Sequence, residues 1–228
     1  MPEIFEGVVI ANEVLDALPV HLVAWRKDGL YERGVGWNDA FVWSERPLPA
    51  GTLRRAAEAI GAQADYVSEI SLVAPALVRS LSAMLRKGAM LLIDYGFGRR
   101  EYYHPQRAQG TLMCHYRHRA HDDPFFLPGL QDLTAHVDFT AVAEAGIDAG
   151  MNILGYTTQA QFLVNCGITQ LLEQHTADET TTRFALTAGV QKLLSPAEMG
   201  ELFKVIALGR GIDGPLIGFA SGDKSRLL

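Results

Sequence analysis

Two short runs of apolar, β-branched residues stand out in the pattern of hydrophobic and polar positions. The first covers residues 7–11, and the second covers residues 89–93 between Gly88 and Asp94. Continuous apolar runs of this length are typical of strands that are buried on both faces of a parallel sheet. The first run begins almost at Met1. We therefore expect either a chain that starts within a fold or an edge strand with the pattern of a central one.

Between these runs the pattern changes from short bursts to a helical period. Residues 19–48 contain apolar bursts separated by turn residues, which predicts a small antiparallel meander. Residues 52–87 predict a helix that Pro75 kinks or splits. The apolar positions of that helix recur at intervals of three and four: Tyr66, Ile70, Val73, Leu77, Leu81 and Leu85. A helix followed by an apolar strand and an acidic residue is the rhythm of an α/β unit.

The second half of the chain begins with an aperiodic stretch. Residues 97–136 show no clear period, and their aromatic content predicts an ordered loop region on the substrate side of the fold. Three helical stretches are expected after it. Asp138 is expected to cap the first, Thr157 or Thr158 the second, and the third covers about residues 179–194.

The C-terminal segment contains a motif that matches a nucleotide-binding fingerprint by its letters. Residues 209–214 read GRGIDG, but Pro215 and β-like residues follow where the GxGxxG fingerprint requires a helix. We interpret this segment as the turn of a closing hairpin between strands at 203–208 and 215–219. A capping box at residues 195–198 predicts a short helix before the hairpin.

A cluster of potential metal ligands lies in the aperiodic stretch. It consists of Cys114, His115, His118 and His121. Residues three apart share a helix face, so zinc is conceivable here. However, arginines are interleaved with the histidines, and the order matches no common zinc motif. We favour a solvated, basic loop and predict no metal.

Composition limits the class of protein. The chain has 228 residues, of which 48% are hydrophobic and 20% are charged, so we expect one globular domain over residues 1–228. The net charge of −6 argues against a non-specific nucleic-acid binder. No apolar run is long enough to span a membrane. Two widely separated cysteines and an N-terminus without a leader pattern favour a reducing, cytoplasmic location.

Polar side chains follow both apolar runs. Asn12 and Glu13 come after the first, and Asp94 comes after the second. Because the ligand crevice of an open parallel sheet lies beyond the carboxyl ends of its strands, these residues are candidates for a site. The alternative for each residue alone is structural: Asn12 would cap a short turn and Asp16 would lie on the surface.

Several blocks of the sequence resemble the MidA-type methyltransferases, which are class I S-adenosylmethionine-dependent enzymes. The blocks extend over nearly the whole chain and read VIANEVLDALPVH, LLIDYGF, QGTLMCHYRHRAHDDPFFLPGLQDLTAHVDF, TTQAQFL and SPAEMGELFKVIALGRG. The resemblance implies an α/β fold, with the C-terminal strands of a Rossmann-like class I methyltransferase sheet, a small antiparallel insertion and added helices. It also implies S-adenosyl-L-methionine as the cofactor.

The resemblance also implies a substrate and a location. Mitochondrial members of that family are protein-arginine methyltransferases that support the assembly of respiratory complex I. A protein substrate, such as a complex I subunit-like protein, is therefore implied, together with a mitochondrial location for eukaryotic relatives.

One feature of the family is absent from this sequence. Family members carry a glycine-rich loop and an acidic residue upstream of the first block, and these hold the cofactor. This chain begins after them, so we expect it to bind the cofactor weakly by itself. The first strand would expose an apolar edge that favours association, and a homodimer is one expectation. A non-enzymatic assembly factor or an inactive fragment stays open as an alternative, and a metal-dependent hydrolase is a weaker one.

The chemistry of arginine methylation assigns roles to these residues. A guanidinium stays protonated in water, whereas carboxylates can orient it and help to take a proton. Glu13 is the first candidate for catalysis, followed by Asp16 and Asp94, and Asn12 with Glu13 is expected to contact the cofactor. The substrate pocket is expected to include Tyr95, Tyr116, His118, Asp132, His136 and Asp138. Loop scaffolding, with a helix cap at Asp138, is the alternative for this last set.

Overall fold

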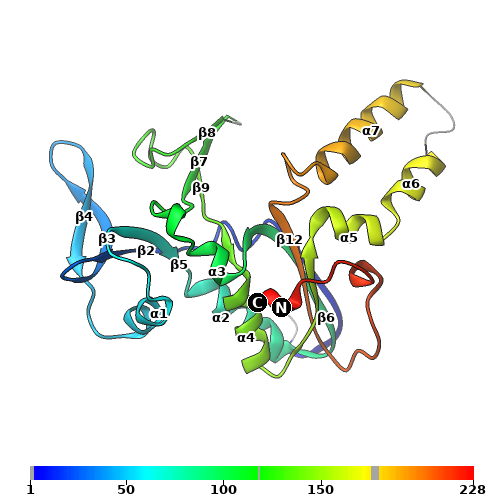
Figure 1. Ribbon diagram of the computed structural model, residues 1–228, viewed down its shortest axis with the longest axis horizontal. Helices are drawn as coiled ribbons and strands as arrows, with labels where there is room; N and C mark the ends of the chain where they lie inside the picture. The colour runs from blue at the N-terminus through cyan, green and yellow to red at the C-terminus, as the bar shows by residue number, and fades with distance from the viewer. Residues whose placement is uncertain (1–2, 118, 176–179) are drawn as a thin grey trace.

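The computed structural model describes residues 3–117, 119–175 and 180–228. Its largest sheet has the strand order β1-β6-β12-β11, and a short strand, β10, also pairs with β6 (Figure 1). β1 is parallel to β6, whereas β12 is antiparallel to both β6 and β11. The strands are β1 (Phe5–Asn12), β6 (Leu85–Phe97), β10 (Val137–Asp138), β11 (Asn152–Thr158) and β12 (Phe203–Arg210). This mixed sheet with its helices confirms the predicted α/β class.

The central strands bury both faces of this sheet. Ile206 and Leu208 of β12 belong to a core that includes side chains of α2 and α4. Val205 and Ala207, which point to the opposite face, pack in a second core with Phe219. The helices around the sheet are α2 (Val73–Met84), α4 (Phe139–Asp148) and α5 (Gln159–Asn165). Strands β6 and β12 are therefore fixed rigidly in the middle of the molecule.

The first strand is an edge strand. Val8 is 66% exposed and Ile10 is 69% exposed, so the prediction of a fully buried strand at 7–11 is wrong. Among the described residues β1 pairs with β6 alone, which leaves its other edge open. Both alternatives given above, a chain that starts within a fold and an edge strand with the pattern of a central one, agree with this open edge.

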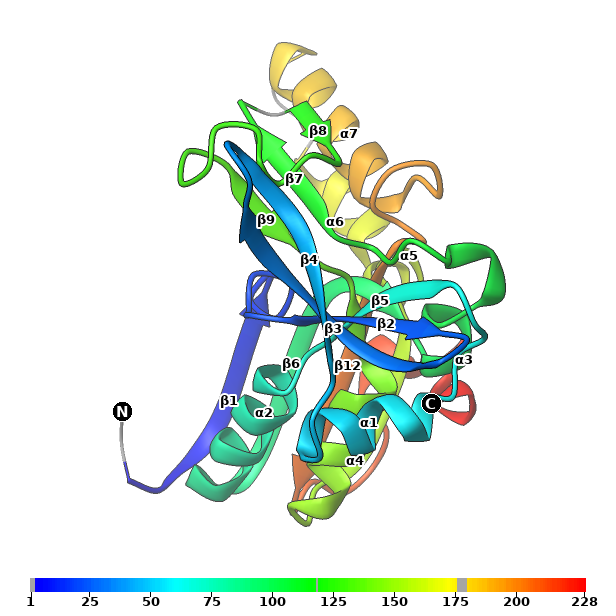
Figure 2. The same ribbon diagram turned by 90° about the vertical axis from the view of Figure 1, so that its left-hand side faces the viewer.

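A second sheet with the order β4-β3-β2-β5 lies beside the first in Figure 1 and in front of it in Figure 2. The antiparallel strands expected in residues 19–48 are present as β2 (His21–Arg26), β3 (Gly29–Trp37) and β4 (Phe41–Pro47). Helix α1 (Thr52–Ile60) packs on this sheet through Ala57.

The helix expected over residues 52–87, kinked or split at Pro75, is wrong, because a strand separates two helices upstream of Pro75. Tyr66 and Ile70 lie in β5 (Tyr66–Ile70), which pairs with β2, and α2 begins only at Val73. All five β5 positions are buried, and a fully buried strand has no period that separates it from a helix. Pro75 lies in the first turn of α2, where a missing N–H costs no helical hydrogen bond.

The aperiodic stretch is ordered and contains a third, small sheet with the order β8-β7-β9. Its strands are β7 (Met113–Tyr116), β8 (Arg119–His121) and β9 (Asp132–Thr134). Before it come a short helix α3 (Arg99–Tyr102) and a 3₁₀ turn η1 (Pro105–Arg107). Secondary structure in this region was not predicted from the sequence, because its strands are too short to show a period.

The C-terminal half confirms two predicted caps. The carboxylate of Asp138 accepts from the N–H groups of Thr140 and Ala141 at the start of α4, and Thr158 caps α5. Two more helices follow, α6 (Ile168–His175) and α7 (Thr180–Leu194), and they extend away from the sheet in Figure 1.

Two C-terminal predictions are wrong. Residues 195–198 form turns instead of a helix, with the carbonyl of Ser195 accepting from Glu198 and Gly200. Residues 215–219 contain the 3₁₀ turn η2 (Ile217–Phe219), so they do not pair with β12, and the chain ends after η3 (Ser225–Leu227). β12 pairs instead with β11 and β6. These two strands provide the hydrogen-bond partners for the backbone of β12, which the expected hairpin would have taken from residues 215–219.

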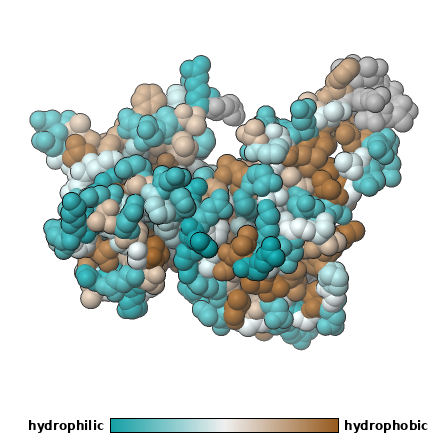
Figure 3. All heavy atoms as spheres, in the orientation of Figure 1, coloured by the Kyte–Doolittle hydropathy of each residue, from teal (hydrophilic) through white to brown (hydrophobic). Residues whose placement is uncertain are grey.

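The surface carries both polar and apolar residues (Figure 3). On the face drawn in Figure 3, apolar residues gather over the region where Figure 1 places the large sheet and the C-terminal segment. Exposed apolar side chains of this segment include Ile217 and Leu227. In the part of the chain that the structure describes, no helix combines the length and apolar character needed to cross a membrane.

We expect Gly96→Ala to destabilise the protein strongly. A Cβ atom at Gly96 would lie 2.1 Å from the carbonyl oxygen of Val137, so β10 could no longer pair with β6 without moving. Overpacking of this kind costs about 3 kcal/mol of unfolding free energy, measurable by urea denaturation. Gly34→Ala, where a Cβ meets open space, is the control. Equal stabilities of the two variants would contradict this account.

Candidate active site at the carboxyl ends of β1 and β6

β1 ends at Asn12, which is paired with Ile93 of β6, and β6 continues to Phe97. The chain then turns sharply at Glu13, which has a φ of 51° and donates its N–H to the carbonyl of Ile93 at 3.0 Å. This turn brings Leu15 and Asp16 to Asp94, near the carboxyl end of β6. Asp16 and Asp94, 78 positions apart in the sequence, consequently come together.

Asp94 anchors the segment that follows β1. Its Oδ2 accepts from the N–H groups of Leu15 at 2.9 Å and Asp16 at 3.3 Å, and its Oδ1 accepts from the N–H of Tyr95 at 2.9 Å. The side chain is 1% exposed. Burial, followed by the charge of Asp16, raises the pKa of Asp94 to about 7, against the effect of the three N–H donors. Both carboxylate oxygens of Asp94 are thus already engaged.

Asp16 differs from Asp94 because it keeps a free acceptor. The hydroxyl of Tyr95 donates to Oδ2 of Asp16 at 2.5 Å, whereas Oδ1 has no hydrogen-bond partner among the described residues. Asp16 is only 6% exposed. Burial and the bond to Asp16 raise the pKa of Tyr95 above its ordinary value, so Tyr95 stays protonated and acts as a donor. A buried carboxylate oxygen without a partner is costly, and a cationic ligand would satisfy it.

His136 closes one side of this cluster. Its ring packs edge-on against Tyr95 and Phe97, with centroid distances of 5.3 Å to each. Burial, followed by the charges of Arg107 and Lys204, lowers the pKa of His136 to about 4. His136 is therefore neutral at physiological pH, and its Nδ1 has no partner among the described residues.

The buried, neutral state of His136 predicts a pH dependence of stability. Its folded pKa of about 4 lies below the ordinary value of 6.5, so the unfolded chain takes up a proton first as the pH falls. The contribution of His136 to stability is fully present above pH 6.5 and is lost as the pH falls toward 4, with about 2 kcal/mol lost at pH 5. His136→Phe keeps an aromatic ring and should reduce this acid-dependent loss. Urea denaturation at pH 8 and pH 5 measures it, and an unchanged difference would contradict the assignment.

The other candidate residues lie apart from this cluster. Asn12 and Glu13 are exposed at the end of β1, where Nδ2 of Asn12 donates to Oε1 of Glu13 at 3.2 Å. Tyr116 and Asp132 lie on the small sheet, where Tyr116 packs edge-on against Phe126. His118 lies outside the described residues.

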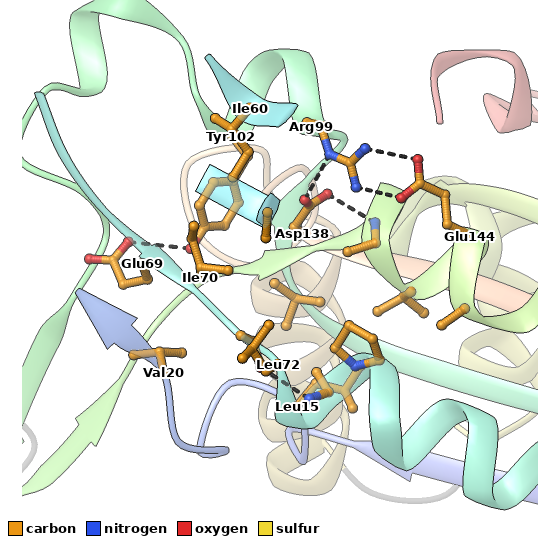
Figure 4. A pocket seen from close by; sticks show the side chains of 18 of the residues that line it. Leu15, Val20, Ile60, Glu69, Ile70, Leu72, Arg99, Tyr102, Asp138 and Glu144 are labelled. Atoms are coloured by element: carbon orange, nitrogen blue, oxygen red, sulfur yellow. Dashed lines mark hydrogen bonds and ion pairs between the residues drawn. The ribbon is translucent and has the colours of Figure 1, made fainter. Parts of the chain in front are cut away.

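Asp138 is held by structural contacts. Besides capping α4, its Oδ2 accepts from Nε of Arg99 at 3.3 Å, and Arg99 in turn is paired with Glu144 at 2.6 Å (Figure 4). These residues and His136 line a cavity of about 310 Å³ between the two larger sheets and α4. The helix-cap alternative for Asp138 agrees with these contacts.

Two features of the site were not predicted from the sequence. Thr134 lies beside Tyr95, close enough for its hydroxyl to lower the Tyr95 pKa, although the pair does not reach hydrogen-bond geometry. Glu69 is 1% exposed and accepts from Thr111 and Leu112. The sequence signal for this buried carboxylate is the single glutamate in YVSEI. It indicates burial only if the stretch is a strand, which the helical spacing of Tyr66 and Ile70 concealed.

The alternative motifs gain no structural support. Gly209 and Arg210 of the GRGIDG motif belong to β12, and no α-helix follows them in residues 211–228. Among the residues that the structure describes, no group of three or more His, Cys, Asp or Glu side chains is arranged to hold a metal ion. The cluster of Asp16, Asp94 and Tyr95 is thus the candidate site with the clearest chemistry.

This geometry can be compared with known proteins. The chain is 32% identical to the mitochondrial protein arginine methyltransferase NDUFAF7 of Mus musculus and 30% identical to that of Danio rerio. Each match covers 89% of this chain, but only 45% and 47% of the relatives. The chain therefore spans about half the length of these curated relatives.

A solved structure is more similar. A protein of Burkholderia thailandensis crystallised with S-adenosyl-homocysteine matches with a TM-score of 0.95 and 56% identity, over 100% of this chain and 59% of the other. A family model described as “Putative S-adenosyl-L-methionine-dependent methyltransferase” matches residues 1–157. By this match over most of its length, and by its likeness to these proteins, the chain belongs to the family of S-adenosyl-L-methionine-dependent methyltransferases.

Proposed function

We propose that the protein methylates arginine side chains of other proteins, and that this chain supplies the site for the arginine. The observation that carries the proposal is the free Oδ1 of buried Asp16, next to Asp94 and the Tyr95 hydroxyl. A guanidinium offers several N–H donors in one plane and carries the charge that this acidic cluster lacks. The names of the mitochondrial relatives support the same acceptor. A complex I subunit-like protein, which the resemblance to the MidA-type enzymes implies, is the specific candidate.

The residues of the cluster have different proposed roles. Asp16 accepts an N–H of the guanidinium through Oδ1, Tyr95 holds Asp16 in place, and Asp94 fixes the segment that carries Asp16. Asn12 and Glu13, exposed at the end of β1, are proposed to face the cofactor. When bound, S-adenosyl-L-methionine supplies an electrophilic methyl group on sulfur. The acidic surroundings of the strand ends fit the positive charge of that sulfur.

Methyl transfer then needs the loss of one proton from the arginine. A bond forms between the methyl carbon and a guanidinium nitrogen while the carbon–sulfur bond breaks, and the electron pair of that bond stays on sulfur. The proton leaves the nitrogen toward Oδ1 of Asp16 and passes on to water. The products are S-adenosyl-homocysteine, methylarginine and a proton. Asp16 contributes mainly by orienting the nitrogen, because positioning is the main demand of such a displacement.

The experiment uses a hybrid enzyme. These 228 residues replace the matched 59% of the Burkholderia thailandensis protein, so that every residue of the site is the one described here. The hybrid is incubated with labelled S-adenosyl-L-methionine and two peptides that differ only in a central arginine or lysine. We expect methyl transfer to the arginine peptide, identified by mass spectrometry. Transfer to lysine alone, or none by a hybrid that binds S-adenosyl-homocysteine, would contradict the proposal.

A further inference from the structure

A groove leads from Asp16 to the tip of the second sheet. It encloses about 640 Å³ and is lined by residues 16–22, by β3 and β4, and by the loop between β8 and β9. One end is buried, since Asp16 is 6% exposed and Ala135 is 3% exposed. The other end is open, since Val35 is 60% exposed and Phe41 is 46% exposed. A long side chain could therefore enter from the open end toward the buried end, which Asp16 helps to line.

Aromatic rings form the open end. Phe125, from the loop between β8 and β9, packs against Trp43 at 4.9 Å and against Phe41 at 6.2 Å, measured between ring centroids. These contacts join β4 to the region of the small sheet, next to which it lies in Figure 2. Prolines 124 and 128 also line the groove. The wall at the open end is thus largely apolar, as in grooves that bind extended peptides.

The charges of the lining leave Asp16 without a cation. Arg33, which also lines the groove, is paired with Glu45 at 2.8 Å. His21 is held by Glu32 at 2.9 Å. Both of these side chains are thus paired with glutamates and not with Asp16, whose Oδ1 has no partner in the described part of the chain. The groove therefore combines an unmatched buried carboxylate at one end with aromatic surface at the other.

We propose that this groove binds the protein segment around the methylated arginine, with the guanidinium at Asp16 and a neighbouring apolar or aromatic side chain on Trp43 and Phe125. The inference rests on the proposed function and adds a sequence preference to it. Substrates with a bulky apolar residue near the arginine bind better than substrates with small residues there. The alternative, which the experiments below distinguish, is that this apolar surface binds a second copy of the chain.

The first test measures peptide binding to the 228-residue chain by calorimetry, without cofactor. Three short peptides are compared: arginine flanked by leucine and phenylalanine, the same peptide with citrulline in place of arginine, and arginine flanked by glycine. Citrulline keeps the shape of arginine but is neutral. We expect the first peptide to bind at least about tenfold more tightly than each of the others. Equal affinities, or no binding of the first peptide at about 1 mM, would overturn the proposal.

Three variants locate the binding surface. Trp43→Ala should weaken the binding of the leucine- and phenylalanine-flanked arginine peptide about tenfold and leave the affinity for the glycine-flanked peptide unchanged. Asp16→Asn should weaken the binding of both arginine peptides and leave the affinity for the citrulline peptide unchanged. Trp37→Ala is the matched control, because Trp37 is 69% exposed on the same hairpin and packs on Phe41 without lining the groove. Thermal unfolding shows that each variant is folded.

The outcomes separate this proposal from the proposed function. If Trp37→Ala and Trp43→Ala weaken binding equally, the groove has no specific role and the proposal is wrong. It is also wrong if Trp43→Ala changes the sedimentation coefficient, since the groove would then be a contact between copies. If the hybrid transfers methyl groups but peptides do not bind in the groove, the groove proposal alone is wrong. If peptides bind with the expected preferences but no methyl group is transferred, the proposed function alone is wrong.

Discussion

Asp16→Asn in the hybrid enzyme should lower kcat/KM for methylation of an arginine peptide by about 10²-fold, while the affinity for S-adenosyl-homocysteine stays unchanged. The substitution keeps the shape of the side chain and its contact with Tyr95 but removes the charge next to the guanidinium. Loss of a group that orients an acceptor and takes part in proton transfer costs about 10²-fold or more.

The control for this prediction is Tyr95→Phe. It removes the hydroxyl that holds Asp16 but leaves both carboxylates in place. We expect a smaller loss, about tenfold, because Asp16 becomes more mobile but keeps its charge. A loss of about 10²-fold in Tyr95→Phe, with kcat/KM of Asp16→Asn unchanged, would show that the hydroxyl and not the carboxylate carries the chemistry.

Asp94→Ala should produce a large loss of stability, about 3 kcal/mol of unfolding free energy. It leaves the N–H groups of Leu15, Asp16 and Tyr95 buried without their acceptor, and each unsatisfied group carries a penalty. For a chain of this size the loss corresponds to a decrease in Tm of about 8 °C. Thermal unfolding followed by circular dichroism measures it.

The matched control for Asp94 is Asp213→Ala. Asp213 is a carboxylate in the C-terminal segment and lies in no element of secondary structure. Its removal should change the unfolding free energy by less than about 0.5 kcal/mol. If Asp94→Ala were equally mild, Asp94 would not anchor the segment that carries Asp16, and the described arrangement of the site would be incorrect.

The sequence predicts which two segments meet at the strand ends, but not the contacts between them. Asp94 and the segment beginning at Asn12 follow two apolar runs, and the rule that ligands bind at the carboxyl ends of parallel strands brings them together. The sequence does not show which carboxylate remains free. That depends on the left-handed turn at Glu13, which places the N–H groups of Leu15 and Asp16 on Asp94.

The errors in the fold come from non-local pairing. Tyr66 and Ile70 have helical spacing, but β5 forms because β2 offers an antiparallel partner 41 to 49 residues earlier, as in the pairs of Trp25 with Tyr66 and His21 with Ile70. Likewise, β12 pairs with β11 and β6 instead of the nearby residues 215–219. Such pairings depend on the packing of the whole sheet, which overrides local preference.

The most direct test of the central claim is the kinetics of Glu13→Gln in the hybrid. The claim is that the buried cluster of Asp16, Asp94 and Tyr95 holds the arginine, whereas the exposed end of β1 faces the cofactor. It predicts a weaker affinity for S-adenosyl-homocysteine and a kcat within about threefold of the unchanged hybrid at saturating cofactor. A loss of kcat of about 10²-fold with unchanged cofactor affinity would contradict it and would place the acceptor chemistry at Glu13.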